Sequence, residues 1–309
     1  MRLGGSGWIA IAALSLAACA GPASHRGTTQ VESVQAAHCK DESDWNEATA
    51  PRRVFGNTWY VGSCGISAIL ITSPEGHILI DGATAEAADG IARSIEASGH
   101  QLRDVRIILN THEHFDHAGG IARLQQLSGA QVLSRAAALP VLHSGLSTRN
   151  DPPHQELKPF PAVPDARPVA DEGVVRAGPL TVQVHATPGH APGSTSFSWR
   201  SCAGAECRQI VYGDSVSALA DGEYLYRDHA DYQAAFKSGM QAIAGIAPCD
   251  ILLTPHPSVS DLWPRLRGEQ PMSSVGACRA LADTGLQNLQ TDLRLNTPEV
   301  RVTINRDKL

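Results

Sequence analysis

The sequence lacks several features that would assign it to common protein classes. It has no basic block: its net charge is −6, and acidic and basic residues are mixed along the chain, so nothing predicts a nucleic-acid partner. Beyond the N-terminus it has no apolar run long enough to span a membrane. It also has no C-x-x-C pair, which argues against a structural zinc site built from cysteines. What remains is a chain of 309 residues with 42% hydrophobic content, sufficient for a sizeable core.

Residues 1–20 are predicted to be an export signal. Arg2 supplies a positive charge, and a short run dominated by apolar residues follows over 8–18. Two cleavage sites fit. Leu16-Ala17-Ala18-Cys19 resembles a lipoprotein signal with a lipidated Cys19, whereas Ala18-Cys19-Ala20 fits release by ordinary signal peptidase after Ala20. The expected location is the periplasm, with a lipid anchor in the outer membrane if Cys19 is lipidated.

The cysteine count agrees with export. Of seven cysteines, either cleavage removes Cys19 from the disulfide count and leaves an even number, which suggests three disulfides in an oxidising compartment. The sequence alone allows 15 connectivities. Pairing between neighbours closes the shortest loops and is the arrangement we expect: Cys39 with Cys64, Cys202 with Cys207, and Cys249 with Cys278.

The rest of the chain divides into an arm, one domain and a tail. Residues 21–50 are small and polar and predict a flexible arm; 51–295 show no composition break, and 296–309 are polar. Within the domain, β-prone runs over 58–80 and at 105–109 alternate with helical segments, and a second block of strands and helices follows from residue 180. Two such blocks predict an α/β layered fold, with two sheets packed together and helices outside.

The chemistry centres on the run from His112 to His117, which holds four potential metal ligands directly after a buried strand. His112 and His114 are expected to face one ion, and Asp116 and His117 another. Two later histidines, His190 and His256, also follow strands and can complete both sets. Three ligands per ion leave a coordination position open, which is typical of catalytic sites, and imidazole and carboxylate donors favour zinc.

This run resembles the H-x-H-x-D-H signature of the metallo-β-lactamase fold superfamily, which implies an αββα sandwich of two mixed β-sheets flanked by helices. Other segments resemble subclass B3 β-lactamases. They are the opening strands from Asn57 to Gly62, Ser194 at the end of the P-G-H-A-P-G-S run, the pair Ser215-x-Ser217, and the last strand before His256. Subclasses B1 and B2 place a cysteine ligand near Ser215, where this sequence has none.

The resemblance implies a monomeric zinc-dependent β-lactamase that confers antibiotic resistance. It would open the β-lactam amide bond of penicillins, cephalosporins and carbapenems with a zinc-bound hydroxide. Carried over to this chain, it implies that two zinc ions use His112, His114 and His190, and Asp116, His117 and His256. Asp116 would also orient the hydroxide, and Ser215 and Ser217 would hold the substrate carboxylate. The chain has no S-x-x-K motif, so these serines are not expected to act as nucleophiles.

Three points stay open in the sequence. A glyoxalase II-type thioesterase or a lactonase is the alternative function on the same fold. Asp214 lies in a Gly-Asp-Ser motif that fits either a metal-bridging ligand or an Asp that orients its loop through hydrogen bonds; the second interpretation is favoured. Trp59 and Tyr60 either line the substrate cleft or pack within the sheet.

Overall fold

The computed structural model describes Met1 and residues 38–295. The predicted signal segment after Met1, the lipidation candidate Cys19, the arm up to residue 37 and the tail 296–309 lie outside the described residues. None of the helices in the described part has both the length and the apolarity needed to cross a membrane.

The first sheet has seven strands whose spatial order follows the chain. The first four strands are antiparallel, and the remaining strands pair in parallel from β4 onward. The strands are β1 (Arg52–Phe55), β2 (Thr58–Tyr60), β3 (Ile69–Ile71), β4 (His77–Ile80), β5 (Val105–Leu109), β6 (Gln131–Arg135) and β7 (Arg167–Val169).

The second sheet has five strands in the order β12-β11-β10-β9-β8. Its pairs are antiparallel except for the parallel pair of β11 and β12. Its strands are β8 (Val174–Ala177), β9 (Leu180–Ala186), β10 (Thr195–Ala203), β11 (Glu206–Tyr212) and β12 (Ile251–Leu253). Both sheets are therefore mixed.

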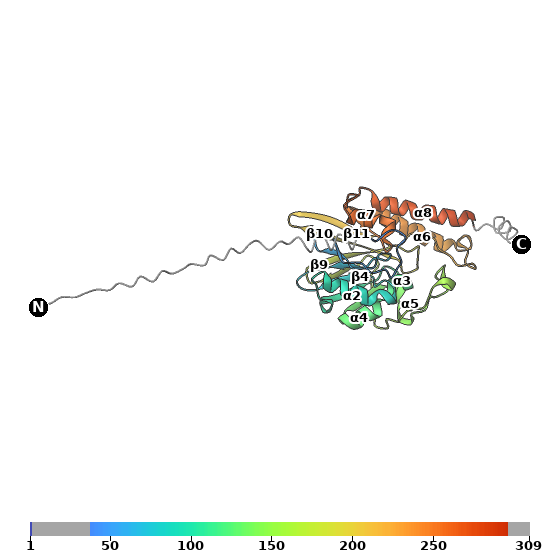
Figure 1. The fold of residues 1–309 in the computed structure, drawn as a ribbon. Helices are drawn as coiled ribbons and strands as arrows, with labels where there is room; N and C mark the ends of the chain where they lie inside the picture. Colours follow the sequence, from blue (N-terminus) through green and yellow to red (C-terminus); the bar gives the residue numbers. More distant parts are fainter. Residues whose placement is uncertain (2–37, 296–309) are drawn as a thin grey trace.

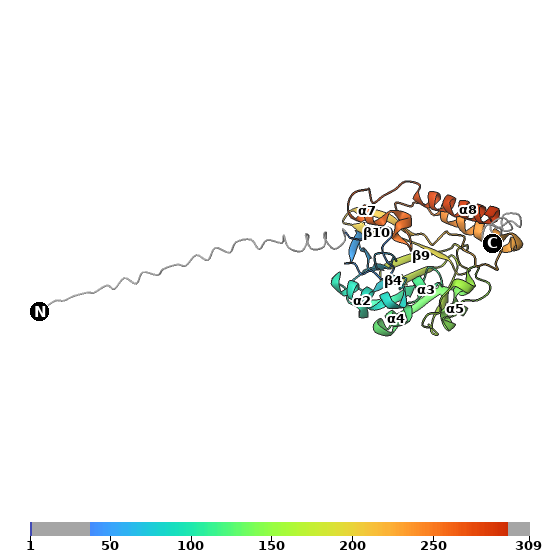
Figure 2. The ribbon, with the colours of Figure 1, turned by 45° about the vertical axis from the view of Figure 1, so that its right-hand side comes forward.

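Helices cover the outer face of each sheet, and the two sheets pack against one another between them (Figures 1 and 2). The first sheet carries α2 (Ala88–Ala97), α3 (Phe115–Ala118), α4 (Ile121–Ser128) and α5 (Leu139–Ser144). The second carries α6 (Ala230–Gly245) and α8 (Ala277–Leu295), while α7 (Leu262–Leu266) places Leu262 and Trp263 in the core between the sheets. The predicted αββα sandwich is confirmed.

The alternation of side chains on the strands produces three apolar layers. In β4, Ile78 and Ile80 point into the core between the sheets, where they join Phe197 of β10. Leu79 of the same strand points the other way and packs with Ile91 of α2. A third cluster lies between the second sheet and the helices α6 and α8. Both faces of each sheet are thus buried, and the strand ends are left to present polar side chains.

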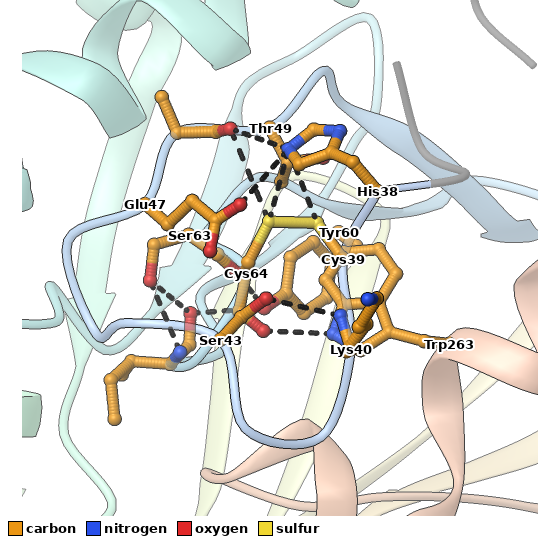
Figure 3. The surroundings of a disulfide bond; sticks show 12 residues. His38, Cys39, Lys40, Ser43, Glu47, Thr49, Tyr60, Ser63, Cys64 and Trp263 are labelled. Atoms are coloured by element: carbon orange, nitrogen blue, oxygen red, sulfur yellow. Dashed lines mark hydrogen bonds and ion pairs between the residues drawn. A yellow bond between two sulfur atoms is a disulfide. The ribbon is translucent and has the colours of Figure 1, made fainter. Parts of the chain in front are cut away.

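The described part of the predicted flexible arm, residues 38–50, packs against the domain, so the prediction of a flexible arm is wrong for this part. Cys39 is fully buried and is bonded to Cys64 (Figure 3). Ser63 donates a hydrogen bond to the carbonyl of Trp45, and Ala48 bridges to Ser63. Composition alone missed these attachments because one disulfide and a few backbone contacts hold a polar segment in place without apolar periodicity.

The structure pairs the cysteines as neighbours, as expected from the short loops. The three disulfides are Cys39–Cys64, Cys202–Cys207 and Cys249–Cys278. The second closes the β10–β11 hairpin, where Cys202 and Cys207 are register partners. The third fastens the start of α8 to the chain leading into β12.

Strands β1, β7 and β8 and helices α5 and α7 were not anticipated from the sequence. They are short, and two of them, α5 and β7, overlap the ends of the proline-rich segment 143–168. That segment contains the last turn of α5, a 3-10 turn at His154–Glu156 and the start of β7. Elements of three to six residues carry too few periodic positions to stand out from a loop.

Candidate metal centre

The histidine-rich segment leaves the end of β5 and is held there by a buried carboxylate. Asp81 accepts hydrogen bonds from the backbone N–H of Thr111 (2.7 Å) and from its hydroxyl (2.8 Å). Asn110 donates to the carbonyl of His112 at 2.7 Å. His114 is extended and precedes α3, which begins at Phe115. The change from extended chain to helix separates the ligands in space.

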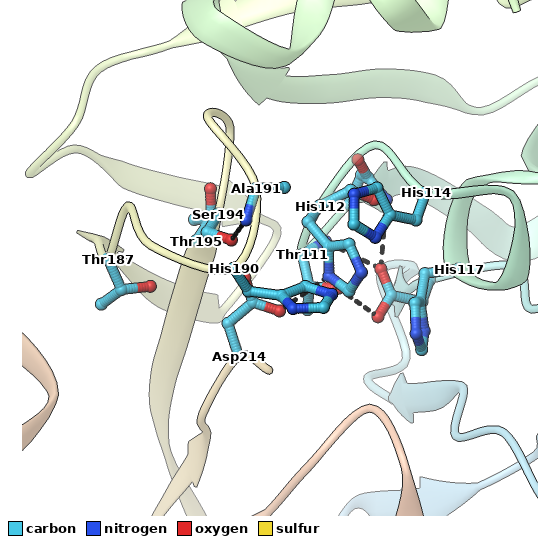
Figure 4. A network of polar contacts seen from close by, with 12 residues as sticks. Thr111, His112, His114, His117, Thr187, His190, Ala191, Ser194, Thr195 and Asp214 are labelled. Carbon is cyan, nitrogen blue, oxygen red and sulfur yellow. Dashed lines mark hydrogen bonds and ion pairs between the residues drawn. The ribbon is translucent and has the colours of Figure 1, made fainter. Parts of the chain in front are cut away.

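His112, His114 and His190 form what we call the first set. Their ring centroids lie 4.7 Å apart in all three pairs, and their ligand atoms all lie within 4.8 Å of one another. Each residue is at most 4% exposed. His190 comes from the loop after β9, so two distant segments meet here (Figure 4).

Each ring of the first set has one nitrogen occupied by an outer partner. Nδ1 of His112 lies 2.9 Å from Oδ1 of Asp214, and Nε2 of His114 lies 2.9 Å from Oδ2 of Asp151. Nδ1 of His190 faces Ser217, 3.0 Å from its carbonyl oxygen and 2.9 Å from Oγ. A ring that donates from one nitrogen presents a bare lone pair on the other, which is the tautomer that binds a metal.

The donor set fits a metal ion on two observations. Nε2 of His112 is buried and has no hydrogen-bond partner among the described residues. Burial lowers the pKa of His112 well below its ordinary value, and it lowers the pKa of His114 to about 4 and that of His190 to about 3. All three rings are therefore neutral at neutral pH, as imidazole ligands must be.

Asp116, His117 and His256 form the second set. Oδ2 of Asp116 lies 3.0 Å from Nε2 of His117 and 3.4 Å from Nε2 of His256, and the two nitrogens are 3.3 Å apart. The second set is more exposed to solvent than the first, because the His256 side chain is 28% exposed. The sets adjoin, since the rings of His112 and His117 are 4.4 Å apart.

Known proteins match the sequence and the fold of this chain. A model of the metallo-β-lactamase superfamily matches residues 61–202. The crystal structure of MEM-A1, a subclass B3 metallo-β-lactamase from a soil metagenome, is 42% identical with a TM-score of 0.80, over 83% of this chain and 100% of that one. The chain belongs to the subclass B3 metallo-β-lactamases. MIM-1 from Novosphingobium pentaromativorans is 41% identical with a TM-score of 0.81, over 84% and 96% of the two chains.

Curated relatives found by sequence have the name of another hydrolase. A hydroxyacylglutathione hydrolase of Anaeromyxobacter dehalogenans is 34% identical over 136 residues, which are 44% of this chain and 42% of that protein. One from a Bradyrhizobium strain is 30% identical over 48% and 52% of the two chains. This metallo-β-lactamase spans about half the length of these relatives. The shared scaffold shows a metal-binding hydrolase, and the substrate must be argued separately.

Asp214 of this metallo-β-lactamase lies outside both sets and faces the ring nitrogen of His112 that points away from them. Its own backbone N–H donates to Ser196 at 3.0 Å. The favoured interpretation of an orienting Asp therefore agrees with this geometry, with one change: the side chain orients the ring of the candidate ligand His112 rather than its own loop.

Trp59 and Tyr60 pack away from the centre. Trp59 lies against His100 and under the guanidinium of Arg53, and Tyr60 is buried against Trp263. These two aromatics thus follow the sheet-packing alternative and not the cleft-lining one.

Two aromatic residues that the sequence analysis did not single out border the second set instead. Trp45 packs against the ring of His256 at a centroid distance of 5.7 Å and against Phe115 at 5.9 Å. Both line a cavity of about 450 Å³ that also contains Lys158, whose Nζ is 5.3 Å from the Phe115 ring centroid. Phe115 was inside the quoted motif, whereas Trp45 gave no sequence signal.

Glu113, also unassigned from the sequence, connects the two ligand-bearing loops. Its Oε1 accepts a hydrogen bond from the backbone N–H of Gly193 at 2.9 Å, close to His190. Burial raises the pKa of Glu113 to about 8. The available sequence signal was the position of Glu113 between the two candidate ligands His112 and His114. In an extended segment, the side chain of the middle residue points away from the side chains on either side of it.

Proposed function

We propose that this enzyme hydrolyses the amide bond of β-lactam antibiotics, including penicillins, cephalosporins and carbapenems, and thereby confers resistance. The observation that carries the proposal is the pair of adjoining donor sets, found in a chain about 40% identical over its catalytic domain to proteins described as metallo-β-lactamases. Two zinc ions per chain are proposed, one in each set.

When bound, the zinc ions would supply a water acidic enough to act as a nucleophile near neutral pH, and an electrophile for the lactam carbonyl oxygen. The chain's own groups prepare this chemistry. Three neutral rings present lone pairs toward one point, and the carboxylate of Asp116 adds negative charge between the sets. Oδ2 of Asp116 faces His117 and His256, and we propose that Asp116 is a metal ligand that also orients the attacking water.

Ser215 and Ser217 are proposed to hold the substrate carboxylate. The Nδ1–H of His190 can donate to Oγ of Ser217, which lies 2.9 Å away. The Ser217 hydroxyl proton is then free to point toward an anion. Ser215 follows Asp214 and is half-buried. Its hydroxyl can therefore donate to a substrate carboxylate without disturbing the packing of the core. Ser217 would therefore serve a ligand ring and the substrate together.

Thioester hydrolysis is the second candidate, because the curated relatives are hydroxyacylglutathione hydrolases. The position of Asp214 beside His112 and outside both sets favours the β-lactamase. The test is a side-by-side assay of a carbapenem, a penicillin, a cephalosporin and S-lactoylglutathione, with and without a chelator. We expect chelator-sensitive hydrolysis of the lactams; a thioester turned over with the carbapenem untouched would contradict the proposal.

We further propose that the enzyme works as a monomer in the periplasm, either free after cleavage behind Ala20 or anchored through a lipidated Cys19 after cleavage in front of that residue. The three disulfides support an oxidising compartment. Intact mass of the purified protein distinguishes the two forms, because lipidation adds acyl mass to Cys19 and cleavage after Ala20 removes that residue. Six free thiols in the exported enzyme would contradict the export proposal.

A further inference from the structure

The outer partners of the first set come from only two stretches of chain. Asp151 lies in the segment 148–156, and Asp214 and Ser217 lie in the segment 213–224. Each bonds the nitrogen of its histidine that faces away from the set. The orientation of all three rings therefore depends on how these two segments sit relative to each other.

Asp221 joins the two segments. Its backbone N–H donates to the carbonyl of Pro152 at 3.0 Å. Its Oδ2 accepts from the guanidinium of Arg149 (2.5 Å) and from the backbone N–H of Gln155 (3.2 Å). These three contacts lie on both sides of Asp151 in the chain. The residue that holds His114 is thus bracketed by bonds to a single carboxylate and its peptide group.

The same carboxylate also fixes its own segment. Oδ1 of Asp221 accepts from the backbone N–H groups of Glu223 (3.0 Å) and Tyr224 (2.9 Å). Asp221 is only 3% exposed, and the guanidinium of Arg149 lies 5.9 Å from the ring centroid of Tyr224. A buried carboxylate with several donors around it resists displacement, because each donor would lose its partner.

We propose that Asp221 is a positioning residue for the first metal: it clamps segments 148–156 and 213–224 together and thereby aligns the outer partners of His112, His114 and His190. Asp221 acts through Asp151, Asp214 and Ser217 and touches no ligand itself. The clamp requires the metal centre, but it does not require that the substrate be a β-lactam.

The test measures zinc affinity of the mature enzyme by competition with a chromophoric chelator, together with the visible absorption of the cobalt(II)-substituted enzyme. Replacing a residue that hydrogen-bonds to a metal ligand typically lowers metal affinity by about 10–100-fold. We expect Asp221→Asn to weaken the first site about tenfold and to alter the cobalt spectrum. Asp89→Asn is the matched control, because Asp89 also pairs with an arginine, Arg123 at 2.9 Å, but on the surface between α2 and α4.

Arg149→Gln is the milder variant, and it keeps the proposal testable if Asp221→Asn does not fold. It keeps the four backbone contacts of Asp221 and removes only a guanidinium whose side chain is 47% exposed. A several-fold loss of zinc affinity is expected. If both variants melt at a lower temperature but bind the first zinc with unchanged affinity, Asp221 is a plain loop anchor and the proposal is wrong.

A double-mutant cycle shows whether the clamp acts through Asp151. Combined with Asp151→Asn, the Arg149→Gln change should cost less zinc affinity than it does alone, because its route to His114 is already cut. Fully additive losses would overturn this route. A wild-type enzyme that binds no zinc at all would contradict the metal centre itself, which is a distinguishable result.

Discussion

The two donor sets are made of similar residues but are supported differently. In the first set all three rings have the second nitrogen bonded to an outer partner, and all three are almost completely buried. In the second set Nδ1 of His117 has no hydrogen-bond partner in the described part of the chain, and His256 is partly exposed beside Trp45. Outer partners orient ligands and raise their basicity, so we expect the first set to bind a metal ion more tightly than the second.

The largest effect is expected from removing one candidate ligand, and its consequence for zinc content should differ between the two sets. His114→Ala should abolish hydrolysis and reduce zinc content toward one ion per chain, held by the second set. His256→Ala should also abolish hydrolysis but leave the first zinc in place with nearly unchanged affinity. Metal analysis of the two dialysed variants checks this, and two zincs with full rate in His114→Ala would show that His114 is not a ligand.

The next largest effect is expected from changing Asp214, the residue that bonds to the ring of His112. Asp214→Asn keeps the size of the side chain but weakens its bond to Nδ1 of His112, so affinity for the first zinc should fall by about 10–100-fold. Affinity at the second site should change much less, because Asp214 contacts neither Asp116 nor His256. Chelator competition resolves the two steps. An equal loss at both sites would indicate that Asp214 bridges them.

Acid should destabilise the metal-free enzyme through the first set. Burial holds the pKa of His114 at about 4 and that of His190 at about 3, below the ordinary 6.5. The unfolded chain therefore binds protons below about pH 6.5 while the folded chain does not, and stability falls as the pH drops toward 4. Melting temperatures of the metal-free enzyme between pH 7 and pH 4.5 check this; His190→Asn should flatten the dependence, and a flat wild-type profile would contradict it.

The smallest effect concerns the open rim of the second set. Trp45→Ala removes the aromatic wall beside His256 and Phe115, so KM for lactams with bulky side chains should rise several-fold while both zinc affinities stay near wild type. A matched change, Trp59→Ala, removes a tryptophan far from the centre. If zinc affinity at the second site falls instead, Trp45 supports the metal rather than the substrate.

The sequence predicted the sandwich and the six candidate ligands because both are encoded locally. Strands such as β5 are continuous apolar runs, and every ligand either falls within one hexapeptide or directly follows a strand. The structure brings these residues together as the two sets. Neighbour pairing of the cysteines also followed from loop length.

The supporting shell could not be predicted in this way. Asp151 and Asp221 lie in segments without periodicity. Their partners His114 and Arg149 lie far from them in the sequence. Trp45 reaches the centre because a disulfide and contacts to Ser63 hold its segment against the domain. Such contacts depend on how loops fold over a finished scaffold, and a single sequence carries no pattern for them.

A stepwise zinc titration of the metal-free enzyme, with carbapenem hydrolysis followed at each addition, tests the central claim most directly. The structure predicts two ions per chain, the first bound more tightly by His112, His114 and His190, and full activity after the second ion binds. A single zinc per chain at saturation, or hydrolysis at the full rate without metal, would contradict it.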